Sequence, residues 1–193
     1  MRDRDNILEV AALQPDYLGL IFYPPSPRYV PSSVGFPAEE LDAICTIGVF
    51  VDEQEAVILE KVNQFGLKGV QLHGQESPEV CARLKALGLK VLKAIPVADS
   101  GDLQLARQYE GCVDLIVLDT KTEAHGGSGQ KFNWQLLADY DAEIPFLLSG
   151  GICAEDVDAV GLIRHPLWAG LDLNSRFEID KGFKNVALLN LLS

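Results

Sequence analysis

The sequence lacks the features that mark several large classes of protein. Its four cysteines, Cys45, Cys81, Cys112 and Cys153, form no CxxC pair, and they therefore suggest reduced, mostly buried thiols and not a zinc site or a disulfide scaffold. No apolar run approaches the roughly 20 residues of a membrane helix, and no secretory signal is recognisable. Basic residues are scarce: the net charge of -12 disfavours nucleic acid and anionic membranes as partners. We therefore expect a cytoplasmic protein that binds a small molecule.

A dinucleotide fingerprint is also missing. No GxGxxG follows the first apolar run, where an open doubly wound sheet would carry it to bind a dinucleotide. Short apolar runs alternate instead with amphipathic stretches. The runs predict strands buried on both faces, at Tyr17–Tyr23, Cys45–Val51, Gly69–His73, Lys90–Ile95, Val113–Asp119, Pro145–Ser149 and Leu167–Leu173. The stretches predict helices at Arg4–Leu13, Gln54–Phe65, Pro78–Leu87, Asp99–Tyr109, Asn133–Asp139, Ala154–Leu162 and Lys184–Leu192.

This alternation of strands and helices predicts a parallel sheet with right-handed crossovers. Seven strands are compatible with an open sheet or with most of a barrel. The unusual polar residues follow the strands, which is where a TIM (β/α)8 barrel carries its chemistry, and this placement favours the barrel. The 193 residues, of which 48% are hydrophobic, suit one domain over residues 1–193, although a TIM barrel typically has about 250 residues.

Two strand ends carry candidate substrate contacts. In FYPPSPRYV, Phe22–Val30, three prolines stiffen the loop and remove backbone donors. The planar guanidinium of Arg28 in this loop suits a carboxylate. His73, in QLHG at Gln71–Gly74, ends another strand and is a candidate contact at the mouth of the barrel. Taken alone, Arg28 is also compatible with a solvated surface residue and His73 with a structural one.

Asp119 ends an apolar run, so we expect its carboxyl in the partly desolvated mouth of the barrel. A desolvated carboxyl keeps its proton to higher pH and can deliver it near neutrality, which makes Asp119 a candidate general acid. The loop that follows fits a closing lid, through Gly126, Gly127, Ser128 and Gly129. The alternative is that Asp119 caps a turn and that the glycines only make the loop flexible.

The segment LLSGGI, Leu147–Ile152, is a strand followed by Gly150, Gly151 and a predicted helix. Backbone amides left bare by glycine, near a helix N-terminus, bind phosphate. In barrels this site lies after the seventh and eighth strands. Asn174 and Ser175 follow the last predicted strand, so we expect them to complete a phosphate site with the two glycines.

Together these segments resemble phosphoribosylanthranilate isomerase, a (β/α)8-barrel enzyme of tryptophan biosynthesis. The resemblance covers nearly the whole chain. It rests on segments in family order: FYPPSPRYV, GVFVDE, VQLHGQESPE, VLKAI, LDTKTEAHGGSGQKFNW, LLSGGI and LDLNSRFE. The combination of QLHG, LDTK…GGSG…F-W and SGG is specific, because the related phosphoribosyl-sugar barrels share only the phosphate site.

The resemblance implies an Amadori rearrangement of N-(5′-phosphoribosyl)anthranilate without metal or cofactor. It implies that Asp119 is the general acid that opens the sugar ring and that Arg28 contacts the anthranilate carboxylate. The other positions that match the family's site would hold the phosphate or the rest of the substrate: Gly150, Gly151, Asn174, Ser175, His73 and Asp172. Members of the family are monomers or homodimers, so either state is expected.

The sequence departs from the family pattern at its start. Family members begin with a strand that ends in K-[IV]-C-G and carries the general base, a cysteine. Here Met1 takes the place directly after that motif, and none of the four cysteines matches it. We therefore expect a TIM barrel with the first β-strand missing, with Tyr17–Tyr23 and Leu167–Leu173 bordering the gap, and impaired catalysis. Two further hypotheses stay open: a non-catalytic barrel that binds phosphate ligands, and another sugar-phosphate isomerase or lyase, against which Arg28 argues.

Overall fold

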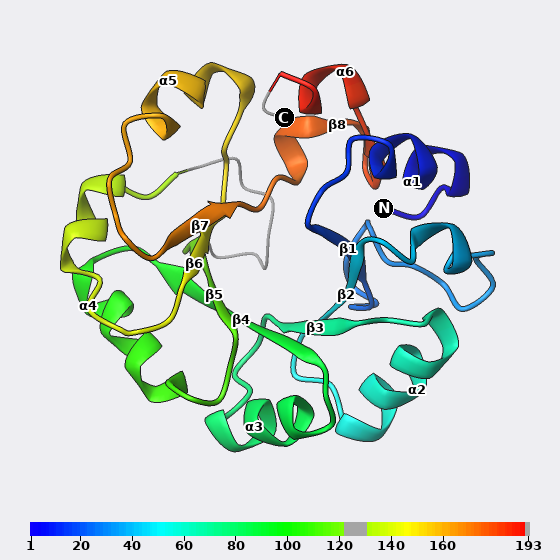
Figure 1. Cartoon of the computed structure of the whole chain (residues 1–193), viewed down its shortest axis with the longest axis horizontal. Coiled ribbons are helices and arrows are strands. Elements are labelled where there is room, and N and C mark those ends of the chain that lie inside the picture. Colours follow the sequence, from blue (N-terminus) through cyan, green and yellow to red (C-terminus); the bar gives the residue numbers. More distant parts are fainter. Residues whose placement is uncertain (122–130, 192–193) are drawn as a thin grey trace.

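A computed structural model describes residues 1–121 and 131–191. Its centre is one sheet of seven parallel strands whose spatial order follows the chain, from β1 to β7. The strands curve into a half-barrel with helices on the outside (Figure 1). Their bounds are β1 Tyr17–Ile21, β2 Cys45–Phe50, β3 Gly69–Leu72, β4 Lys90–Val97, β5 Leu115–Thr120, β6 Phe146–Leu148 and β7 Trp168–Leu171. All seven predicted strands are confirmed, with ends that shift by a few residues.

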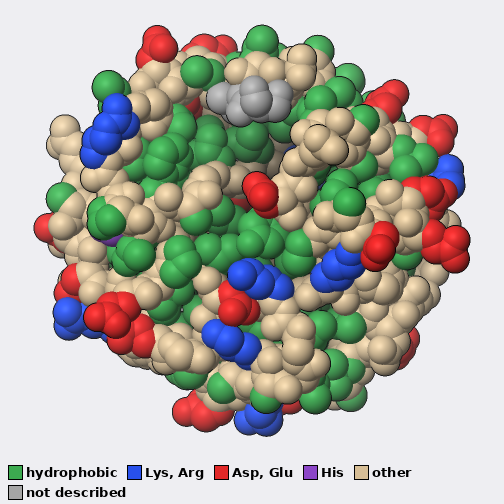
Figure 2. Space-filling view, viewed as in Figure 1, with side chains coloured by type: hydrophobic (Ala, Val, Ile, Leu, Met, Phe, Trp, Pro, Cys, Tyr) green, Lys and Arg blue, Asp and Glu red, His purple; other side chains and the backbone are tan. Residues whose placement is uncertain are grey.

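The strands form where the apolar runs predict them because both faces of the sheet are covered. Every residue of β3 and of β6 is buried, as expected for central strands of a parallel sheet. The residues that face the helices join the large hydrophobic core, which includes Phe50, Val70 and Ile116. The concave face carries a second, smaller cluster made of Ile47, Leu92, Ala94, Leu115, Val117 and Leu147. Hydrophobic side chains gather at the centre of the face shown in Figure 2, and most charged ones lie toward its rim.

Helices of the first half begin and end close to their predicted positions. These are α1 Arg4–Ala11, α2 Glu55–Phe65 and α3 Pro78–Ala86. Local signals explain their ends. The side chain of Asp3 caps α1 by accepting a hydrogen bond from the Asn6 backbone N–H. Gly66 ends α2 in the left-handed conformation that glycine adopts at low cost, and Pro78 starts α3 at a position where no backbone donor is needed.

Helices of the second half are shorter than predicted. In place of the helix predicted at Asp99–Tyr109, the structure has a four-residue helix, α4 Ser100–Leu103, which the 3-10 helix η2 Gln104–Tyr109 continues. Asn133–Asp139 is the 3-10 helix η3 Trp134–Asp139. Ala154–Leu162 is a 3-10 turn, η4 Ala154–Asp156, followed by α5 Val157–Val160. Two further 3-10 turns are η1 Glu39–Leu41 and η5 Ser175–Phe177.

The C-terminal region departs most from prediction. The expected helix from Lys184 begins only at α6 Val186–Leu189. Before it lies an antiparallel hairpin that the sequence did not predict, β8 Glu178–Asp180 and β9 Phe183–Lys184. Lys184 therefore belongs to a strand, and its side chain turns toward the barrel instead of starting a helix.

β1 and β7 are the two edges of the sheet, and we call the opening between them the seam. Its β1 side is partly covered by the N-terminus and by the loop after β1. The Gly19 carbonyl accepts a hydrogen bond from the Met1 amino group at 3.3 Å, and the Ile21 carbonyl accepts one from Val30 N at 2.8 Å. On the outside, the buried side chain of Asn6 exchanges two hydrogen bonds with the backbone of Lys184. Helix α1 and the C-terminal hairpin are thereby joined across the seam.

Two expectations from composition can be compared with the structure. The four cysteines are free thiols, but only Cys81 is fully buried, and Cys45, Cys112 and Cys153 are half-buried. Within residues 1–121 and 131–191, no helix is long and apolar enough to cross a membrane.

Candidate active site

The main cavity lies on the concave side of the sheet and reaches into the seam. Its volume is about 680 Å³, which is within the range of small-molecule sites. Every described residue that the sequence predicted for the site lines it: Arg28, His73, Asp119, Gly150, Gly151, Asp172, Asn174 and Ser175. They meet because the carboxyl ends of parallel strands open at one end of a barrel. The predicted lid residues Gly126, Gly127, Ser128 and Gly129 lie outside the described residues.

Asp119 lies at the centre of a hydrogen-bonded chain. Its Oδ2 is 3.2 Å from His73 Nε2, and Gln71 Nε2 is 3.1 Å from His73 Nδ1. With the Gln71 amide donating to Nδ1, the imidazole proton lies on Nε2 and points at Asp119. The other oxygen of Asp119 accepts from the Thr120 backbone N–H at 2.9 Å. The carboxyl group is therefore held in one orientation at the end of β5, with its side chain only 14% exposed.

The position of the Asp119 carboxyl requires a glycine at residue 150. It has a φ of 86°, and a Cβ at this position would lie 2.4 Å from Thr120 Oγ1 and 2.7 Å from Asp119 Oδ1. A side chain at residue 150 would therefore displace Asp119. Gly151 also has a positive φ, of 65°. Both glycines line the cavity, and without a Cβ they leave their backbone accessible to a ligand there.

The predicted helix N-terminus behind these glycines is weaker than expected. Residues 154–160 form a 3-10 turn and a four-residue helix, so a long helix dipole is not available there. After the adjacent strand β7, Ser175 starts the turn η5, and the Asn174 side-chain oxygen accepts from Lys184 Nζ at 2.9 Å. The groups at these two strand ends that suit an anion are therefore chiefly backbone amides and the nearby lysine.

Asp172 follows β7 and faces the same cavity. Its Oδ2 accepts a hydrogen bond from Ser149 Oγ at 3.1 Å. Burial, and next the charge of Asp119, raise the pKa of Asp172 above its ordinary value. Two carboxyl groups, Asp119 and Asp172, thus line the same cavity.

Arg28 is paired with a glutamate, Glu178. Its Nε lies 2.9 Å from both carboxylate oxygens of Glu178, and one terminal nitrogen lies 2.6 Å from Oε2. Both side chains are mostly buried, at 13% and 5% exposure. Burial would raise the pKa of Glu178, but the hydrogen bonds from Arg28 and the charge of Lys184 outweigh it and hold that pKa below its usual value. The guanidinium therefore presents one remaining edge to the cavity.

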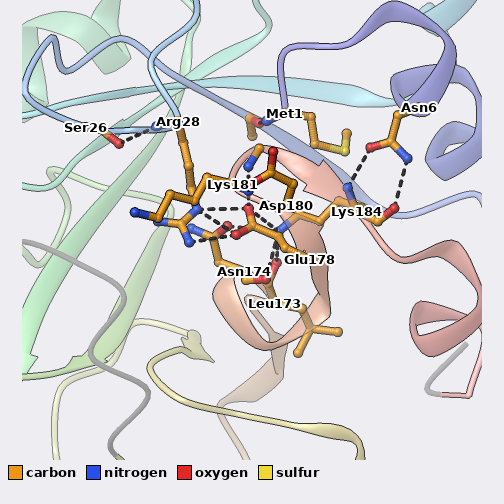
Figure 3. A network of polar contacts seen from close by, with 12 residues as sticks. Met1, Asn6, Ser26, Arg28, Leu173, Asn174, Glu178, Asp180, Lys181 and Lys184 are labelled. Carbon is orange, nitrogen blue, oxygen red and sulfur yellow. Dashed lines mark hydrogen bonds and ion pairs between the residues drawn. The ribbon is translucent and has the colours of Figure 1, made fainter.

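Lys184 lies behind the same glutamate. Its Nζ donates to the Leu173 and Asn174 carbonyls at 3.2 and 3.0 Å, and it lies 3.7 Å from Glu178 Oε1. Burial lowers the pKa of Lys184 to about 8, although Glu178 and Asp172 favour its charged form. Figure 3 shows Arg28, Glu178, Lys184 and Asn174 as one connected group beside Met1 and Asn6.

Comparison with known proteins assigns this arrangement to a family. The family model described as "N-(5'phosphoribosyl)anthranilate (PRA) isomerase" matches residues 1–192. The chain belongs to that family. Its activity is thus phosphoribosylanthranilate isomerisation, a step of tryptophan biosynthesis, as predicted from the sequence motifs.

Individual members of the isomerase family agree with this assignment. The N-(5′-phosphoribosyl)anthranilate isomerase of Parabacteroides distasonis is 44% identical over 96% of this chain and 86% of its own length. A solved structure of monomers of the dimeric isomerase from Thermotoga maritima matches with a TM-score of 0.82 at 28% identity, over 100% of this chain and 92% of that one. An isomerase in complex with reduced 1-(o-carboxyphenylamino)-1-deoxyribulose 5-phosphate matches with a TM-score of 0.80 at 27% identity, with 100% and 92% coverage.

Several residues of the isomerase site were not found by sequence reasoning. Glu178 and Lys184 link its two sides, and Ser149 and Gln71 hold its carboxyl and imidazole groups. Gln71, Ser149 and Glu178 lie inside the recognised motifs QLHG, LLSGGI and LDLNSRFE, so the signal was their place in those motifs. Lys184 had no such signal, because the hairpin that positions it was unexpected. Among the residues that the structure describes, no group of three metal-ligating side chains converges.

Proposed function

We propose that the isomerase works by an Amadori rearrangement in which Asp119 is the general acid. The observation that supports this role is the fixed carboxyl of Asp119 in the cavity, between His73 and Gly150. Protonation of the furanose ring oxygen by Asp119 opens the ring to a Schiff base. Removal of the C2 proton then gives an enolamine, which tautomerises to the ketone 1-(2-carboxyphenylamino)-1-deoxyribulose 5-phosphate. Proton transfers suffice for each step, so the proposal needs no metal or cofactor.

The substrate would span the cavity from Arg28 to the glycine loop. The free edge of the Arg28 guanidinium suits the anthranilate carboxylate. Gly150, Gly151, Asn174 and Ser175 also line the cavity, and their backbone amides suit the phosphate. His73 and Asp172 line it as well and suit the sugar hydroxyls. The reduced product analogue bound by a relative carries the same two anionic groups.

We further propose that the barrel is completed by a strand in the seam that carries the general base. No cysteine lines the cavity, and the four thiols lie elsewhere in the described chain. A parallel strand between β1 and β7 would pair with both edges and would bring its C-terminal residue to the C2 side of the substrate. Without such a base, the same cavity is suited to binding the phosphorylated ligand and turns it over slowly.

The test compares three proteins on freshly made phosphoribosylanthranilate: the chain as printed, the chain with a strand ending in Cys-Gly added before Met1, and that extended chain with Asp119→Asn. The turnover number of the extended chain should exceed that of the printed chain by about 10²–10⁴-fold, because a positioned general base accelerates proton transfer by that factor. Asp119→Asn should remove most of the gained activity while leaving binding of the reduced product analogue nearly unchanged. Equal turnover by the printed and extended chains would refute the proposed base. Light scattering on the same samples decides between monomer and homodimer.

A further inference from the structure

Three parts of the chain meet around one carboxylate, that of Glu178, beside the cavity. Arg28 comes from the loop after β1, Asn174 from the loop after β7, and Glu178 and Lys184 from the hairpin. Glu178 accepts from Arg28 on one side and from the Gly182 backbone N–H at 3.1 Å, and it lies 3.7 Å from Lys184 on the other side. It is 5% exposed. A buried carboxylate between two cations destabilises the folded protein if either cation is removed, because its charge is then not fully compensated.

The two cations that meet at Glu178 hold different parts of the site. Arg28 uses its Nε edge on Glu178, which fixes the plane of the guanidinium and leaves the remaining edge for the cavity. Lys184 donates to both oxygens of Asn174 and to the Leu173 carbonyl, which fixes the loop that carries Asn174 and Ser175. Glu178 itself lies behind these groups and is not among the residues that line the cavity.

We propose that Glu178 is a positioning residue that sets the carboxylate-binding end and the phosphate-binding end of the site together, through Arg28 and Lys184. This inference rests on the proposed function, in which Arg28 receives the anthranilate carboxylate and the Asn174–Ser175 loop receives the phosphate. Both ends depend on one acceptor, so its loss weakens recognition at both, even though Glu178 makes no contact with the substrate.

The sign of the effect separates positioning from simple charge balance. A glutamate that served only to neutralise Arg28 and Lys184 would oppose an anionic ligand, and Glu178→Gln would then bind the ligand more tightly. A glutamate that positions the two cations has the reverse effect, because the amide loses one charged acceptor and cannot hold both partners in place. Glu178→Gln should therefore bind more weakly.

The experiment measures binding by calorimetry, with the chain as printed, of three synthetic ligands. These are reduced 1-(o-carboxyphenylamino)-1-deoxyribulose 5-phosphate, its analogue without the carboxyl group and its analogue without the phosphate. For Glu178→Gln the affinity for the first ligand should fall on the order of 10- to 100-fold, as expected on breaking a buried charge pair. Both truncated ligands should also bind more weakly than they bind to the parent protein. An unchanged or increased affinity, or a loss confined to one truncated ligand, overturns the proposal.

Two further variants complete the design. Glu55→Gln removes an exposed Arg–Glu pair, with Arg83, on the outer helices α2 and α3, and it should leave all three affinities unchanged. Lys184→Met cuts only the branch to the phosphate loop, so it should weaken both phosphate-bearing ligands and spare the one without phosphate. This variant keeps the test decisive if Glu178→Gln does not fold, because equal losses for all three ligands would overturn the two-branch arrangement. Failure of the parent chain to bind the first ligand would instead refute the proposed function itself.

Discussion

Two buried lysine–glutamate pairs lie at different places along the arc of the sheet, and each fixes a loop that carries site residues. At the middle of the arc, Lys93 on β4 lies 3.2 Å from Glu76 and donates to the Leu72 and Gly74 carbonyls of the loop after β3. At the seam, Lys184 lies 3.7 Å from Glu178 and donates to the Leu173 and Asn174 carbonyls of the loop after β7. In both places a lysine from a neighbouring strand fixes the loop that carries site residues.

The two pairs differ in what surrounds them. Lys93 and Glu76 are 3% and 4% exposed, and Glu76 also accepts from the Asp52 and Gly74 backbone N–H groups. Lys184, by contrast, lines the cavity and shares its glutamate with Arg28. The Lys93–Glu76 pair is therefore buried within the protein and has no side toward the cavity. The Lys184–Glu178 pair is also buried, but Lys184 borders the cavity. The difference indicates that Lys93 acts mainly on stability and Lys184 on both stability and ligand binding.

The largest effect is expected from breaking the pair at the middle of the arc. Lys93→Met should lower the free energy of unfolding by about 3–5 kcal/mol, because Glu76 would remain buried without its counter-charge. Urea denaturation followed by circular dichroism measures this change. Lys68→Met is the matched control, since its partner Asp42 is exposed, and it should change the free energy by about 1 kcal/mol or less. A loss no larger than that of the control would show that the Lys93–Glu76 pair is dispensable.

A smaller effect, dependent on pH, is expected at the seam. The pKa of Lys184 is lowered from 10.5 to about 8 in the folded protein, so between these values the unfolded chain holds one more proton. The free energy of unfolding should then gain up to about 3 kcal/mol from this residue as the pH rises from 8 to 10.5. Below pH 8 Lys184 is buried as a cation, and the free energy of unfolding is lowest with respect to this residue. The groups that face it are Glu178, Asp172 and Arg28.

Lys184→Met isolates this contribution, because the other titrating groups are common to both proteins. The unfolding free energy of the parent minus that of the variant should increase between pH 8 and pH 10. Urea titrations at intervals of one pH unit provide the measurement. A difference that stays constant over this range would mean that Lys184 keeps its ordinary pKa in the folded state.

The smallest effects compare a glycine in each region. A Cβ on Gly69, in the paired part of the sheet, would lie 2.5 Å from the Lys90 carbonyl and 2.7 Å from Ile47 Cδ1. Gly69→Ala should therefore cost about 1–3 kcal/mol through overpacking. A Cβ on Gly19, at the seam, would meet only Val49 Cγ2 at 3.8 Å, so Gly19→Ala should change the stability by about 0.5 kcal/mol or less. Thermal denaturation of the two variants measures the loss of melting temperature that each substitution causes. Similar losses would show that a side chain is tolerated equally well in the two regions.

The sequence predicted those parts of the molecule that depend on local pattern. Apolar runs such as Gly69–His73 form strands because both faces of a parallel sheet are buried, and the site residues meet because strand ends share one end of the barrel. Arg28 was found because prolines and a strand end precede it. Its partner was not, because Glu178 lies 150 positions away in the sequence and no local rule links the two.

The failures in the second half of the chain have a related cause. Short amphipathic stretches such as Ala154–Leu162 fit helix periodicity, but periodicity alone leaves the choice between α and 3-10 turns to tertiary packing. The hairpin at residues 178–184 carries charged side chains where a strand pattern would alternate. Two of these charges, Glu178 and Lys184, are buried against Arg28 and Asn174 from elsewhere in the sequence, so the hairpin is a product of the assembled seam.

The link between Asn6 and the backbone of Lys184 has a consequence for the order of folding. These two residues are 178 positions apart, and contacts of such long range form late, because the entropy of closing the loop must be lost first. During synthesis, α1 leaves the ribosome long before the hairpin that receives it. The two sides of the seam can therefore be linked only after the hairpin has been synthesised, long after α1 itself.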